Sequence, residues 1–150
     1  MGRYPEQQLE HVYLKQITRL KALRDCLVLE RENLINLDLN SLWMLVERKH
    51  DILTDLEGIE NEIKIFSHEE DSTFKPDSQR FCLNLSKRAN QLKDEIKTRN
   101  AENRIFIQDA LGFIDELMSI FAGRVQEPTA YGKVSRSQKK TQPVMIYREV

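Results

Sequence analysis

One apolar seam, spanning residues 78–121, constrains the fold of this chain more than any other feature of its sequence. The seam positions follow one another at steps of three or four residues, and they are Phe81, Leu85, Ala89, Leu92, Ile96, Arg99, Asn103, Phe106, Ala110, Phe113, Leu117 and Phe121. Such spacing, uninterrupted by proline, predicts one long helix that packs against other helices. At 1.5 Å per residue, this helix would be about 66 Å long.

Two shorter helices are predicted before it. The first starts near Pro5, a residue suited to the first helical turn, and ends near Asn36. Its inner face is marked by Leu9, Tyr13, Leu20, Leu23, Leu27 and Leu34, with Val12 and Ile17 on the flanks, and Gln16 and Glu30 interrupt this stripe. The second helix repeats the spacing of three and four, at Leu42, Leu45, Lys49, Ile52, Leu56, Ile59, Ile63 and Phe66, and Val46 and Leu53 widen this stripe. The sequence therefore predicts three helices of unequal length.

The connection between the first two helices is predicted at Asn36–Ser41, although this segment has no glycine or proline. Asparagine, aspartate and serine favour helix caps over helix interiors, and Asp38 is the best N-cap candidate for the second helix. The alternative is one continuous helix over residues 6–66. The apolar positions change phase across Leu37 and Leu39, which argues against this alternative. Both interpretations stay open at the level of sequence.

The second connection is predicted at His68–Pro76, which is polar and acidic. The segment Pro76–Ser78 is a helix-start signal, because proline suits the first turn and a carboxylate there faces the positive end of the helix dipole. Gly123 is placed to end the third helix. We therefore expect a helical domain over residues 1–123 and an extended or mobile basic tail over residues 124–150.

The composition places the chain among soluble, helix-rich proteins, since 40% of its 150 residues are hydrophobic and 31% are charged. We predict an all-α fold, an elongated antiparallel three-helix bundle or coiled-coil hairpin with a long third helix and an extended C-terminal tail. The net charge of −1 predicts no general affinity for nucleic acid or anionic membranes. The tail from Ala122 onward carries +4, which leaves −5 for residues 1–121. A solubilising terminus and a site for an acidic partner both fit this tail.

Side-chain combinations that catalyse reactions or hold metals are missing from the sequence. His11, His50 and His68 have no histidine or cysteine neighbour at metal-ligand spacing, and HExxH, CxxC, GxSxG and glycine-rich phosphate loops do not occur. Cys26 and Cys82 are interpreted as small apolar residues beside the helix seams. We therefore expect no catalytic, cofactor-binding or metal site, and no enzyme activity.

The sequence also predicts where the protein works. No run of 18 apolar residues occurs, so we expect no direct membrane insertion. Residues 1–6 lack the apolar run of a signal peptide, and two widely separated cysteines suit a reducing compartment. We therefore expect a cytoplasmic protein.

The length of the third helix suggests a function. The first two helices would each be roughly 45 Å long, so an antiparallel bundle would leave roughly 20 Å of the third helix past the Asn36–Ser41 turn. This stretch, about Gln108–Phe121, contains seven large apolar residues: Leu111, Phe113, Ile114, Leu117, Met118, Ile120 and Phe121. Exposed monomer surfaces are rarely so apolar, so we expect a covering element.

Three covering elements fit this stretch: the chain's own tail, a second copy, or an amphipathic helix of another protein. The last makes the chain a protein-binding module. The second makes it a structural coiled-coil or adaptor protein whose seam serves self-assembly. The periodicity alone does not decide among them.

Three groups of residues, in order along residues 6–132, have the spacing of known motifs. The first group consists of Leu29–Asp38, Leu42, Glu47–Lys49, Ile52, Leu53 and Leu56. The second consists of Asn100, Asn103, Ile105, Ile107 and Leu111, and the third of Tyr131 and Gly132. Together they resemble the FlgN-type flagellar export chaperones, and the first group looks like the first hairpin of that family. The chain departs from the family at Ser135, where many members have a second glycine.

The resemblance implies a cytoplasmic chaperone with no nucleotide or other cofactor. Its clients would be hook-associated proteins of the hook–filament junction, held by their C-terminal helical segments until delivery to the export gate. The C-terminal half of such chaperones is linked to client binding, which agrees with the apolar stretch at Leu111–Phe121. Tyr131 and Gly132 would dock on the export gate. We expect protein partners, no nucleic acid, and a monomer or weak homodimer.

Overall fold

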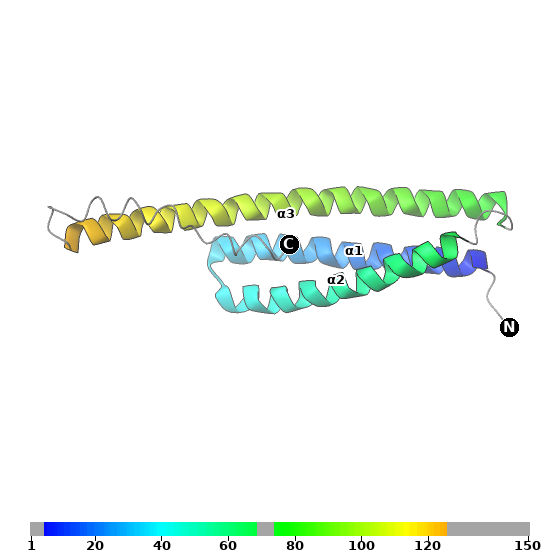
Figure 1. Cartoon of the computed structure of the whole chain (residues 1–150), viewed down its shortest axis with the longest axis horizontal. Helices are drawn as coiled ribbons and strands as arrows, with labels where there is room; N and C mark the ends of the chain where they lie inside the picture. Colours follow the sequence, from blue (N-terminus) through cyan, green and yellow to red (C-terminus); the bar gives the residue numbers. More distant parts are fainter. Residues whose placement is uncertain (1–4, 69–73, 126–150) are drawn as a thin grey trace. The chain divides into compact units, whose positions relative to one another are not determined.

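The part of the chain that the computed structural model describes consists of three α-helices (Figure 1). They are α1, Pro5–Asn36, α2, Leu39–Ser67, and α3, Pro76–Val125. The structure describes residues 5–68 and 74–125, with side chains up to Gly123. Over these residues the fold is all-α and contains no strand, as predicted.

The chain divides into two compact units, Met1–Asn100 and Ala101–Val150. The boundary falls inside α3, so the first unit contains α1, α2 and residues 76–100. The predicted separation of a tail from residue 124 onward lies almost entirely outside the described residues, and it stays a prediction. Within the described part, α3 passes Gly123 and ends at Val125.

The two-residue connection between α1 and α2 explains why the alternative of one continuous helix is wrong. Leu37 has φ 56, a left-handed conformation that ends a helix. Its amide donates to the carbonyl of Leu34 at 3.4 Å, and the amide of Asp38 donates to the carbonyl of Asn33 at 2.9 Å. This is the Schellman pattern, here with leucine where glycine is usual.

Asp38 also starts the next helix, as the sequence predicts. Its carboxylate accepts from the Ser41 amide at 3.2 Å and from the Ser41 hydroxyl at 2.6 Å. The hydroxyl bond, followed by the amide bond, lowers the pKa of Asp38, because both favour the ionised form. One residue therefore closes α1 and caps α2.

Ion pairs between α1 and α2 show the relative direction of these two helices in the first unit. Lys15 pairs with Glu62 at 3.7 Å, and Arg19 pairs with Asp55 at 3.2 Å. Since later residues of α1 meet earlier residues of α2, these helices are antiparallel, as Figure 1 shows. A third ion pair in the same ladder joins Glu30 to Lys49, whose side chains are only 11% and 16% exposed, respectively.

The start of α3 is attached to the start of α1. The Glu6 carboxylate accepts from the Lys75 amide at 2.8 Å and from the Ser78 hydroxyl at 3.1 Å. Further along, Arg24 lies 3.9 Å from Glu95. These contacts follow the same order in both helices, so the first part of α3 runs parallel to α1.

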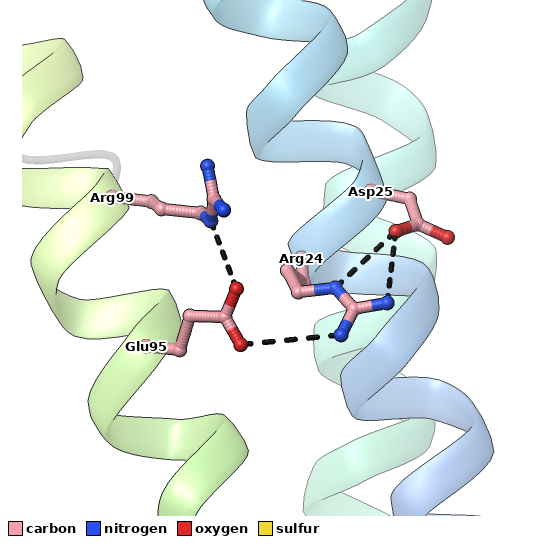
Figure 2. Close-up of polar contacts among 4 residues, drawn as sticks. All are labelled: Arg24, Asp25, Glu95 and Arg99. Carbon is pink, nitrogen blue, oxygen red and sulfur yellow. Dashed lines mark hydrogen bonds and ion pairs between the residues drawn. The ribbon is translucent and has the colours of Figure 1, made fainter.

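Figure 2 shows the polar cluster that contains the contact between Arg24 and Glu95. Glu95 lies between two guanidinium groups, Arg99 of its own helix at 3.1 Å and Arg24 of α1. Arg24 also contacts Asp25 at 3.4 Å. All four side chains are partly exposed, so we expect this cluster to fix register more than to add stability.

The apolar core of the first unit has two parts. The larger cluster takes residues from all three helices: Ile17, Leu20, Leu23, Cys26, Leu45, Ile52, Leu56, Ala89 and Leu92. The smaller cluster lies near the α2–α3 connection and consists of Leu9, Phe74 and Cys82, with Tyr13, Ile63 and Phe66 against it. The predicted inner faces of α1 and α2 therefore supply most of the core.

Some residues assigned to inner faces lie elsewhere. Phe81, the first predicted position of the third seam, is exposed, and its neighbour Cys82 is buried in its place. Val46 and Leu53, assigned to the stripe of α2, are also exposed, because each sits about 100° around the helix from a buried neighbour.

Candidate protein-binding surface

The seam of α3 changes character along its length. In the first unit it is buried at Ala89 and Leu92 and half-buried at Ile96. In the second unit Asn103 is buried, whereas every seam position from Ala110 to Phe121 is exposed. One periodic pattern therefore contains both core and surface.

Three exposed seam residues, Phe113, Leu117 and Phe121, lie among seven large exposed apolar side chains that we call the α3 apolar face. Their exposed fractions range from 36% to 64%, and they are Leu111, Phe113, Ile114, Leu117, Met118, Ile120 and Phe121. Full burial of one such side chain is worth about 1.5–3 kcal/mol. With roughly half of each exposed, several kcal/mol of possible apolar stabilisation are not realised within the second unit.

The length of α3 fits this division. After Arg24 of the Arg24–Glu95 pair, α1 has 12 more residues, ending at Asn36. After Glu95, α3 has 30 more, ending at Val125. Counted from this ion pair, α3 therefore continues for 18 more residues than α1 does, and the α3 apolar face lies among the last of them.

The α3 apolar face covers about half the circumference of the helix. At 3.6 residues per turn, its members span about 180° from Ile120 to Leu111. Asp109 and Glu116 follow at one edge, and Asp115 follows at the other. A stripe that packs on one core is usually narrower, at about 100°.

Other predicted positions are placed as follows. Tyr131 and Gly132, predicted for docking on the export gate, lie outside the described residues. The thiols of Cys26 and Cys82 are buried, as expected of small apolar residues, and burial raises the pKa of the Cys26 thiol.

Two further findings concern metals and membranes. Within residues 5–68 and 74–125 no three histidine, cysteine, aspartate or glutamate side chains gather as a metal site would require. No helix in the described part of the chain is both long enough and apolar enough to cross a membrane.

Sequence reasoning missed a second exposed apolar group, which surrounds the α1–α2 connection. Its five members are 59–78% exposed, and they are Ile35, Leu37, Leu39, Trp43 and Met44. A signal was present, because Leu39, Trp43 and Val46 repeat at steps of three and four on a line displaced from the core stripe of α2. The buried stripe of Leu45, Ile52 and Leu56 obscures this second line.

No curated protein and no solved structure matches the chain. The model of the family described as FlgN protein matches residues 1–139, which contain all three helices and the α3 apolar face. Because this match covers most of the sequence, the chain belongs to the FlgN family of flagellar export chaperones.

Proposed function

We propose that this chain is a cytoplasmic chaperone for hook-associated proteins of the hook–filament junction. It binds their C-terminal helical segments, keeps them unassembled and delivers them to the flagellar export gate. The observation that carries the proposal is the exposed α3 apolar face in a chain of a chaperone family. FlgN is a family of chaperones and not of enzymes, so binding, with no chemical step, is the expected activity.

The mechanism is stoichiometric masking. An amphipathic client helix would place anchors at i, i+3, i+4 and i+7 against the α3 apolar face, and each helix would cover the other's apolar side chains. Met118, unbranched and adaptable, suits a surface that accepts more than one client. Burial of apolar area supplies the free energy, so no nucleotide is required.

We propose that the tail serves delivery. Tyr131 and Gly132 are the docking residues for the export gate, on the basis of the family resemblance. Deletion of residues 126–150, or Tyr131→Ala alone, should spare client binding and reduce export of the client. If the deletion removes client binding instead, the tail belongs to the binding surface.

Charged substitutions test the proposed surface. Phe113→Asp and Leu117→Asp should each abolish capture of a recombinant C-terminal segment of a junction protein from the same genome. Both side chains are exposed, so circular dichroism should stay helical. Phe81→Asp is the matched control, since it changes an exposed phenylalanine of the same helix in the first unit, and it should bind normally.

Two results would contradict the proposal. Full client affinity in both Asp variants would remove the α3 apolar face from the site. An obligate oligomer that ignores junction proteins, seen by sedimentation velocity, would favour a structural coiled-coil protein. A monomer that forms a 1:1 complex is the expected result.

A further inference from the structure

The borders of the α3 apolar face carry one sign of charge. Between Ile105 and Phe121 there are three acidic residues and no lysine, arginine or histidine. Asp109 and Glu116 follow Ile120 around the helix at one edge, and Asp115 follows Leu111 at the other. All three carboxylate side chains are exposed. An element lying on this face therefore meets carboxylates on both sides.

From this arrangement we infer that the α3 apolar face accepts an amphipathic helix whose own apolar stripe is bordered by lysine or arginine. The inference rests on the proposed function and deepens it, because it states the charge pattern of the client segment. Opposite charges flanking an apolar contact select a partner and its orientation more than they add affinity.

The same charges argue against two other occupants. A second copy of this face would place three carboxylates against three carboxylates, and like charges brought together disfavour that pairing. A membrane surface rich in anionic lipid would be repelled in the same way. A helix with a basic border is the occupant whose apolar stripe and charges both complement the α3 apolar face and its acidic borders.

The test uses two synthetic 18-residue peptides with identical leucine, methionine and phenylalanine anchors. One has lysine at the bordering positions and the other has glutamate. Fluorescence anisotropy at about 50 mM salt should give roughly tenfold tighter binding of the lysine peptide to the full-length chain, since each exposed pair contributes a small free energy. At about 0.5 M salt this preference should shrink, because screening shortens the reach of exposed charges.

The first variant removes the acidic border. Asp109→Asn, Asp115→Asn and Glu116→Gln together keep the shapes of the side chains and should abolish the preference for lysine. Binding of the glutamate peptide should improve at the same time. A preference that survives this exchange would overturn the inference.

A matched control separates the border from the net charge of the protein. Asp51→Asn, Glu57→Gln and Asp94→Asn also remove three exposed carboxylates, all from the first unit and none from an ion pair within the described residues. This variant should keep the preference for the lysine peptide. Loss of the preference in the control would show attraction to net charge, which overturns the inference.

The remaining outcomes distinguish this inference from the proposed function. Equal binding of both peptides, abolished by Leu117→Asp, would overturn the charge selection and leave the apolar site standing. Binding that Leu117→Asp does not change would overturn the site itself. If neither peptide binds until Lys139→Glu and Lys140→Glu are introduced, the chain's own basic tail is the occupant, and the inference is wrong. Self-association that Leu117→Asp abolishes would identify a second copy instead.

Discussion

The same substitution, leucine to alanine, at two positions of α3 should distinguish a core position from a surface position. Leu92 is 0% exposed in the first unit, and Leu117 is 38% exposed in the second. Leu92→Ala leaves a cavity among three helices and should cost about 3 kcal/mol, within the usual range for buried leucines. Leu117→Ala creates no enclosed cavity and keeps a strong helix former, so it should cost less than about 1 kcal/mol.

Urea and thermal unfolding followed by circular dichroism measure the difference. At roughly 2–4 °C per kcal/mol for a chain of this size, Leu92→Ala should lower the melting temperature by roughly 6–12 °C. Leu117→Ala should leave it almost unchanged, yet weaken capture of the client segment about tenfold, as loss of an interface anchor does.

Equal destabilisation by the two variants would refute the reasoning. It would mean that Leu117 is covered in solution by the tail or by a second copy. A neutral Leu92→Ala would equally contradict the described core. We therefore expect Leu92→Ala to lower stability and Leu117→Ala to weaken capture with little loss of stability, because one seam has two roles.

Three further predictions concern the helices of the first unit. Leu37→Gly should raise the free energy of unfolding by about 0.5–1 kcal/mol in urea titrations, because glycine tolerates the left-handed conformation and the leucine side chain is exposed. Glu30→Leu should lower that free energy by about 2 kcal/mol by leaving Lys49 unpaired in a mostly buried position, and adding Lys49→Met should recover most of the loss. If the double variant is no more stable than Glu30→Leu alone, the pair is not the cause. The hydrogen bonds from the Ser41 hydroxyl and amide lower the pKa of Asp38 in the folded state below its ordinary value. The ionised cap therefore stabilises the fold fully above that ordinary value, and less as pH falls through the folded pKa. The difference in melting temperature between the wild type and Asp38→Asn should therefore narrow from pH 5 to pH 2, and a constant difference would contradict the role of the charge.

The periodic positions made most of the fold predictable. The steps of three and four placed all three helices, and proline and aspartate marked the starts of α3 and α2. The left-handed residue at the α1–α2 connection was not predictable, because Leu37 has no intrinsic preference for that conformation. It is imposed by the helices on either side, which need a connection of only two residues.

Burial was less predictable than periodicity. Phe81 and Leu92 belong to one pattern, but only Leu92 is buried, because the neighbouring helices decide which positions are covered. Trp43 shows the converse case, since it lies outside the predicted core stripe and forms part of an exposed apolar surface that was not predicted, although its spacing is visible in the sequence. Periodicity identifies a helix face, whereas burial depends on what lies opposite.

Charge adds the information that periodicity lacks. In the first unit, acidic and basic residues meet across helices, as in Arg19–Asp55 and Lys93–Glu60, so the chain supplies both members of each pair. Burial of part of Glu60 opposes ionisation, but the bond from Lys93 outweighs it and lowers the pKa of Glu60. Between Ile105 and Phe121 the chain supplies only acids. A seam bordered by both signs of charge can be satisfied within the fold, whereas a seam bordered by carboxylates alone is complementary to a basic partner. This difference in charge supports our proposal that the α3 apolar face binds a client helix.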